Sequence, residues 1–157
     1  MRRNLYLEDL SVGAKYRAGP VKVTIEDIRR FASEFDPQSF HLDEEAAKSS
    51  MFRGLVASGW HTAALTMRML VDGGMPFAEG AVGAGAELEW LRPVRPGDSL
   101  TVESEILEIT PSRSRKDRGI VRMRTTTFNQ NGEAVQTLTS RIIAFSRKAR
   151  DGGEASA

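Results

Sequence analysis

The sequence predicts an α+β fold in which a curved antiparallel β-sheet wraps around one long apolar helix. The segment from Ser58 to Val71 has apolar residues on every side of a helix, and Arg68 is its only full charge. Most segments with strand character follow that helix in the chain. A helix that is apolar all round belongs inside a core, and a sheet of about five strands that curves around it provides the cover.

The first elements are a strand and two shorter helices. Residues 15–24 predict a strand that is bent or at the sheet edge, because it contains Gly19-Pro20. Thr24 has the character of an N-cap, and apolar residues at spacings of three and four then predict a helix over 25–35. Pro37 disfavours helical geometry at the preceding residue and ends this helix. Asp43 is expected to cap a short helix over 44–49.

The long helix and four strands complete the predicted domain. Gly73-Gly74 closes the helix, as glycine commonly does at helix C-termini. Strands are expected at about 81–91, 99–109, 119–130 and 134–145, and Asn131-Gly132 is a strong hairpin signal between the last two. We therefore expect one domain over residues 1–147, followed by a disordered tail over 148–157 that is rich in small and polar residues.

Composition excludes several classes of function. The chain has 157 residues, enough for one good core, and its formal charge of +1 does not favour binding to nucleic acid or to a membrane surface. It has no cysteine, which excludes disulfides, thiolate metal sites and cysteine nucleophiles. No apolar run approaches the roughly 20 residues of a membrane span, so we expect a soluble cytoplasmic protein.

One short stretch has the residues of an acid/base site. Asp36 and His41, one of only two histidines, lie five residues apart on a loop that Pro37 stiffens. Ser58 and Gly59 stand at the start of the long helix, where the first backbone amides have no partner within the helix. A carboxylate, an imidazole and a bare amide at the positive end of a helix dipole are the parts that such chemistry needs.

The run from Phe31 to Glu44, which contains Asp-Pro-Gln-Ser-Phe-His, resembles the active-site segment of the MaoC-like dehydratases. These are also called (R)-specific enoyl-CoA hydratases, or hydratase 2, and belong to the hot dog fold superfamily. The resemblance continues through Gly54 to Thr62 and through the Arg-Pro-Val-Arg-Pro-Gly-Asp turn, and covers most of the chain from Tyr6 to Phe145. It implies the hot dog fold, with the long helix at its centre.

The resemblance also implies the roles of three residues. The catalytic aspartate and histidine of the family fall on Asp36 and His41, and its oxyanion glycine falls on Gly59. In some members a serine further along the helix supports the aspartate, and the equivalent position here is Met67. The implied reaction is reversible syn addition of water to a trans-2-enoyl-CoA thioester, which gives an (R)-3-hydroxyacyl-CoA. It implies no metal and no cofactor, since coenzyme A is part of the substrate.

These residue types suit the reaction for physical reasons. Water loses a proton as it attacks C3 while C2 gains one, so a carboxylate and an imidazole that both hold the water can divide the transfer. The thioester carbonyl meanwhile acquires enolate charge, which the Gly59 amide would stabilise if Ser58 caps the helix.

Substrate contacts are expected from Ser58, Trp60, Phe40 and Arg92. For the phosphates of coenzyme A, Arg92 and Arg95 compete with Arg113 and Arg115, although a solvated hairpin tip is the favoured reading of the basic run over 113–118.

Other readings stay open beside the hydratase. A hot dog thioesterase would hydrolyse the same thioester with a carboxylate, and a non-catalytic hot dog subunit would bind an acyl group. His61 is expected to be a packed or substrate-lining histidine, and we expect no metal site at His41, Asp43, Glu44 and His61 because their spacing matches no ligand signature. By analogy with hot dog proteins, the partners are an acyl-CoA thioester and a second copy, in a homodimer or a dimer of dimers.

Overall fold

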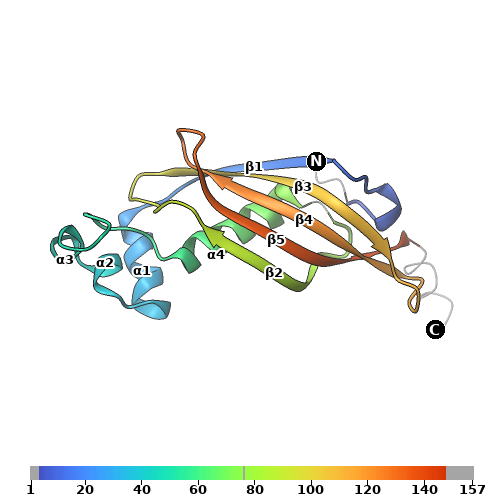
Figure 1. Ribbon diagram of the computed structural model, residues 1–157, viewed down its shortest axis with the longest axis horizontal. Coiled ribbons are helices and arrows are strands. Elements are labelled where there is room, and N and C mark those ends of the chain that lie inside the picture. The colour runs from blue at the N-terminus through green and yellow to red at the C-terminus, as the bar shows by residue number, and fades with distance from the viewer. Residues whose placement is uncertain (1–3, 76, 148–157) are drawn as a thin grey trace.

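The computed structural model describes residues 4–75 and 77–147 and contains one five-stranded antiparallel sheet. The sheet has the order β1-β3-β4-β5-β2, so that β1 (Lys15–Lys22) and β2 (Val82–Trp90) form its edges. Its interior strands are β3 (Ser99–Pro111), β4 (Arg118–Phe128) and β5 (Ala134–Phe145). Figure 1 shows the short helices gathered at one end of the molecule and the sheet extending away from them. The predicted α+β class and hot dog architecture are confirmed.

Two of the helices between β1 and the long helix begin at the predicted N-cap residues. Helix α1 (Ile25–Phe35) has the predicted bounds, and the Thr24 side chain accepts a hydrogen bond from the Asp27 N–H. Helix α3 (Glu44–Lys48) is capped by Asp43, whose carboxylate accepts from the two amides at positions 45 and 46. The expected loop between them contains a further turn of helix, α2 (Ser39–Leu42). The expectation of a loop was wrong here, because four residues are too few to show a helical period.

The long helix differs from its prediction in what it buries. Helix α4 (Gly59–Met69) continues into a π-helical turn, η2 (Leu70–Gly74), and a short 3-10 turn, η1 (Leu7–Asp9), precedes β1. Thr62 and Thr66 are buried, whereas Trp60 and Met67 are 61% and 49% exposed. The expectation that this helix is buried on every side is therefore wrong for a single chain. Helix α4 packs against β1, β3 and α1 and contacts β4 and β5 through Thr66, and the exposed side chains of Trp60 and Met67 mark its open side.

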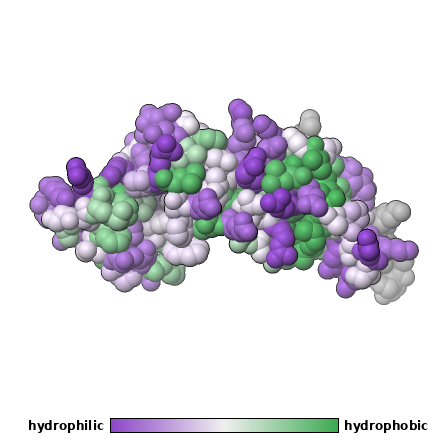
Figure 2. Space-filling view, viewed as in Figure 1, coloured by the Kyte–Doolittle hydropathy of each residue, from purple (hydrophilic) through white to green (hydrophobic). Residues whose placement is uncertain are grey.

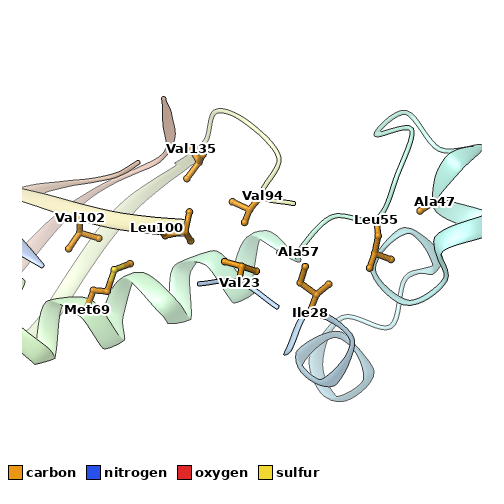
Figure 3. Close-up of a cluster of buried hydrophobic side chains, with 10 residues drawn as sticks. All are labelled: Val23, Ile28, Ala47, Leu55, Ala57, Met69, Val94, Leu100, Val102 and Val135. Carbon is orange, nitrogen blue, oxygen red and sulfur yellow. The ribbon is translucent and has the colours of Figure 1, made fainter. Parts of the chain in front are cut away.

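The core has two clusters along the sheet. Figure 3 shows the first, which extends from Met69 of α4, near Leu100 and Val102 of β3, to Ile28 of α1, beside Ala57 and Leu55. The second contains Leu70, Ile106 and Met123. These clusters fix α1 and α4 relative to the sheet and so position the segments that carry the candidate site.

The outer face of the sheet is mostly polar, with hydrophobic neighbours at one end. Ile120 is the cross-strand neighbour of Ile143, which in turn pairs with Val82. Figure 2 shows hydrophilic residues spread along the whole face, with hydrophobic patches in the half of the molecule that contains the sheet. The tight turn between β4 and β5 occurs at the predicted place, with Gly132 at φ 72°. The predicted tail over 148–157 lies outside the described residues.

Candidate active site

Asp36 sits where α1 ends. It is the C-cap residue, with φ −152° and ψ 68°, and Pro37 follows it. Its Oδ2 atom accepts a hydrogen bond from the Ser58 hydroxyl at 2.7 Å, and its Oδ1 atom accepts one from the Gln38 side-chain amide at 2.6 Å. The side chain is 17% exposed. The carboxylate is therefore fixed from both sides while part of it stays accessible.

His41 faces this carboxylate from α2. Its imidazole is 6% exposed, and its Nε2 atom lies 3.2 Å from Asp36 Oδ2. The other ring nitrogen, Nδ1, lies 2.6 Å from the backbone carbonyl oxygen of Val56, which can only accept, so we assign a hydrogen to Nδ1. With the hydrogen on Nδ1, the neutral ring presents the lone pair of Nε2 on the side of Asp36. Nε2 is thus the nitrogen available for proton transfer.

The surroundings of Asp36 favour its ionised form. Burial by itself raises the pKa of this carboxyl, but the hydrogen bonds from Ser58 and Gln38 and the nearby charge of His41 outweigh it. The net result is a pKa below the usual value for an aspartate. At neutral pH the site therefore holds a carboxylate that is ready to accept a proton.

Ser58 and Gly59 form the predicted start of α4. The Ser58 oxygen accepts from the Trp60 N–H at 3.3 Å, and the Ser58 carbonyl accepts from the amides of His61 and Thr62. Within the described part of the chain, the Gly59 N–H is the amide of this first turn that has no acceptor. The expected bare donor at Gly59 is thus present geometrically. The Ser58 side chain is fully buried, bonds to Asp36 and to the Trp60 amide, and is not among the residues that line the cavity around Gly59, so its contact with substrate stays a prediction.

Gly59 also makes room for a tryptophan of β2. A Cβ atom built on Gly59 would lie 2.5, 2.7 and 2.9 Å from three ring carbons of Trp90, closer than real Cβ contacts. Trp90 in turn meets the Trp60 ring edge-on, with 5.1 Å between ring centroids. A glycine is therefore required here by the close approach of the indole, and Trp90 is a site residue that the sequence analysis did not identify.

These groups open onto one cavity of about 530 Å³, a size suited to a small-molecule ligand. Asp36, His41 and Gly59 line it together, as do Phe40, Trp60 and Arg92, three of the four expected substrate contacts. The remaining lining is mostly apolar: Met51, Phe52, Val56, Ala57, Leu91, Pro93 and Val94, with Gln38, Thr62 and Trp90. The arrangement combines an acid/base pair and an amide donor with an apolar chamber.

The arginines considered for phosphate binding lie in different places. Arg92 is at the cavity, where Glu133 lies 3.4 Å from its Nε atom and the Ala134 carbonyl accepts from its Nη1 atom. Arg95 donates to the Phe52 carbonyl nearby. The β3–β4 hairpin that carries Arg113 and Arg115 lies at the far end of the sheet from α2 (Figure 1). Within one chain, only the first pair lies near the candidate site.

The second histidine is packed. The ring of His61 stacks on Phe31 at 4.9 Å between centroids, and burial lowers its pKa. Its Nδ1 atom has no hydrogen-bond partner among the described residues.

A larger cavity, of about 850 Å³, lies around η2 and the residues before β1, and the predicted catalytic residues do not line it. The predicted catalytic residues therefore lie together in the cavity at the start of α4.

Comparisons with known proteins find similarity to a domain family and to hydratases and dehydratases. The family model for the MaoC like domain matches residues 9–129. A MaoC-like dehydratase from Rhodospirillum rubrum is 56% identical, with a TM-score of 0.90 over 92% of this chain and 99% of that one. The R-hydratase PhaJ1 from Pseudomonas aeruginosa is 32% identical, with a TM-score of 0.76 over 92% of this chain and 88% of that one. The 3-hydroxybutyryl-CoA dehydratase of Methylorubrum extorquens is 34% identical over a match that covers 72% of this chain and 71% of that protein. No helix in the described ranges is long and apolar enough to cross a membrane. The chain belongs to the MaoC-like domain family.

Proposed function

We propose that this chain is a hydro-lyase that adds water reversibly to a trans-2-enoyl-CoA thioester and forms an (R)-3-hydroxyacyl-CoA. The observation that carries the proposal is the meeting of Asp36 and His41, 3.2 Å apart, in the same cavity as the free Gly59 N–H. The names of the R-hydratase PhaJ1 and of the 3-hydroxybutyryl-CoA dehydratase support the reaction class and the coenzyme A thioester.

The acid/base pair would perform the proton transfers. A water molecule held by Asp36 and His41 Nε2 loses a proton to the pair as its oxygen bonds to C3. The pair then gives a proton to C2 on the same face, which makes the addition syn and restores the starting state. The Val56 carbonyl keeps His41 Nδ1 protonated and Nε2 directed at the reaction. No electrons are transferred, so the proposed reaction needs no redox cofactor.

The Gly59 amide would stabilise the charge that develops on the thioester oxygen. It lies at the N-terminus of α4, where the helix dipole is positive. The apolar lining beside it lowers the local dielectric and strengthens such an interaction. Loss of one oxyanion donor typically costs roughly 10²–10³ in rate.

A panel of enoyl thioesters tests the proposal. The wild-type protein is mixed with short, long and branched trans-2-enoyl-CoA substrates, and loss of the conjugated double bond is followed together with release of free thiol. Loss of conjugation without thiol supports hydration. Release of thiol would assign a thioesterase instead, and no reaction with any member of the panel would contradict an acyl-CoA hydratase.

Two variants test the residues. Asp36→Ala and His41→Ala should each lower hydration at least about a hundredfold, since a positioned acid/base group contributes roughly 10²–10⁴. Glu34→Ala is the matched control, because it removes an exposed carboxylate from the same helix two residues before Asp36. Activity of either site variant within a few fold of Glu34→Ala would remove that residue from the mechanism.

We also propose that the protein works as a homodimer that covers the open side of α4. The residues of β2 that share a face with buried Gln136 and Ser140, namely Trp90 and Ala86, are themselves exposed. Trp60 and Met67 of α4 are exposed as well, and β2 is an edge strand with one unpaired side. An exposed apolar surface next to a free strand edge is typical of an interface. Light scattering would give the mass, and Met67→Lys should shift it to a monomer, whereas a monomeric wild type would contradict the proposal.

A further inference from the structure

Trp90, at the end of β2, occupies the space beside the free amide. Its indole ring comes so close to Gly59 that even one methyl group on that residue would overlap it, at 2.5 Å. The ring also lines the cavity that contains Asp36 and His41. The indole therefore forms the wall of the cavity beside Gly59, the residue whose N–H is free.

The indole is held by a buried polar network that links four elements. Trp90 Nε1 donates to Gln136 Oε1 of β5 at 3.1 Å, and Gln136 Nε2 donates to Thr66 Oγ1 of α4 at 3.0 Å. The Thr66 hydroxyl lies 2.7 Å from that of Thr127 on β4. Gln136 is the cross-strand neighbour of both Trp90 and Thr127, and Gln136, Thr66 and Thr127 are fully buried.

The hydrogen-bond chemistry gives this network one direction. An indole N–H can only donate, so the Gln136 oxygen must face it and the Gln136 amide nitrogen must face Thr66. Because Thr66 accepts from Gln136, its own hydrogen is free to go to Thr127. Rotating the indole away would leave the Gln136 oxygen buried without a donor, which is costly, so the network holds the ring in place.

We propose that Trp90 is the specificity-determining wall beside the thioester and that Gln136 is the positioning residue that holds it. The inference rests on the proposed function, because it takes the thioester oxygen to bind at Gly59. The substrate atoms nearest that oxygen are the carbonyl carbon, C2 and the thioester sulfur, and of these only C2 can carry a methyl branch. The wall therefore excludes acyl groups that carry a methyl branch at C2 and admits unbranched ones.

The test compares a branched and an unbranched acyl group in wild type and Trp90→Val. Hydration is measured with trans-2-butenoyl-CoA and trans-2-methyl-2-butenoyl-CoA, and binding is measured by calorimetry with butanoyl-CoA and 2-methylbutanoyl-CoA, which cannot be hydrated. A methyl group in an apolar pocket changes discrimination by about 10–200-fold. Two branched-to-unbranched ratios result, one of hydration rates and one of binding constants. Trp90→Val should therefore shift both ratios at least about tenfold toward the branched compound.

Gln136→Leu tests the positioning role. It keeps Trp90 but removes the acceptor that holds the indole, so both ratios should shift in the same direction and by less than in Trp90→Val. Thr125→Val is the matched control, because it also removes a buried side-chain hydrogen bond from the sheet, the one to Ser104 at 3.0 Å, and does not touch Trp90. Its ratios should equal those of the wild type. A shift in Thr125→Val as large as in Gln136→Leu would show that general loosening, and not the indole, sets the ratio.

The outcomes separate this inference from the proposed function. If the wild type hydrates no member of the thioester panel but Trp90→Val shifts the binding ratio, the hydratase proposal is overturned and the role of Trp90 in specificity is kept. Binding ratios that agree within twofold in wild type and Trp90→Val would show that Trp90 does not determine specificity, whatever the hydration activity. Wild-type protein that binds neither saturated thioester would overturn both.

Discussion

The substitution Ser58→Ala removes a hydroxyl that makes two contacts. That hydroxyl donates to Asp36 Oδ2 at 2.7 Å and accepts from the Trp60 N–H at 3.3 Å as the N-cap of α4. The residue is completely buried, so water does not take over either bond without a rearrangement. One substitution therefore acts on both the stability of the helix and the proton affinity of the carboxylate.

The two effects have different sizes and different dependence on pH. Loss of an N-cap residue costs about 0.5–2 kcal/mol of unfolding free energy, regardless of the state of Asp36. A hydrogen bond to a charged group contributes about 1.5–3 kcal/mol. If the hydrogen bond from Ser58 to Asp36 is lost at the transition state, the hydration rate falls by about 10- to 100-fold, since about 1.4 kcal/mol corresponds to tenfold in rate.

The pH dependence follows from the lowered pKa of Asp36, to which the Ser58 hydrogen bond contributes. A carboxyl with a lowered pKa in the folded state stabilises the protein above its unfolded pKa, and this stabilisation disappears as pH falls through the folded pKa. Ser58→Ala should raise the pKa of Asp36. The acid limb of the hydration rate should therefore move to higher pH, and the stability difference from wild type should shrink below about pH 4.

Thr24→Ala separates capping from catalysis. Thr24 is the N-cap of α1 and accepts from the Asp27 N–H at 3.1 Å, away from the acid/base pair. Below about pH 4, urea unfolding should show a comparable capping loss in both variants, whereas at neutral pH Ser58→Ala should lose more stability. Only Ser58→Ala should shift the pH profile of kcat. An unshifted acid limb in Ser58→Ala would refute the view that this hydroxyl tunes Asp36.

Two further predictions concern the cavity. Gly59→Ala keeps the amide donor but places a Cβ atom 2.5 Å from the Trp90 ring, so it should lose about 1–3 kcal/mol in urea unfolding, as overpacked sites do. Trp90→Val in the same chain should recover most of this loss, and an equal loss in both backgrounds would contradict the steric explanation. Arg92→Ala should raise KM for coenzyme A thioesters with kcat little changed, because Arg92 lies at the cavity. Glu133→Gln, which releases Arg92 from its 3.4 Å contact, should not raise KM, and an unchanged KM in Arg92→Ala would exclude a role in binding.

The parts of the site that the sequence predicted are those in which local chemistry is decisive. Pro37 ends α1 at Asp36, and the small residues Ser58 and Gly59 begin α4. Each is a short-range effect of backbone geometry and capping, which can be read without knowledge of the fold. The short helix α2, which presents His41, was not predicted because its four residues show no period.

The residues that the sequence did not reveal are joined across long separations. The bond from Ser58 to Asp36 spans 22 residues, that from Trp90 to Gln136 spans 46, and that from Gln136 to Thr66 spans 70. A serine, a glutamine and a threonine have no periodic signature of their own. Only the antiparallel register, which places Gln136 opposite both Trp90 and Thr127, brings these side chains together.

Helix α4 shows why the hydrophobic pattern alone gave the wrong burial. Its buried positions include Thr62 and Thr66, whereas the larger apolar side chains of Trp60 and Met67 are exposed. A buried threonine is acceptable where its hydroxyl is paired, and Thr66 is paired with both Gln136 and Thr127. An exposed tryptophan and methionine next to a free strand edge are instead consistent with a surface that a second copy covers. In the proposed homodimer, the apolar character of the helix would serve two interfaces, one with the sheet of its own chain and one with a partner. Trp60, which lines the cavity, would connect the second interface to the candidate active site.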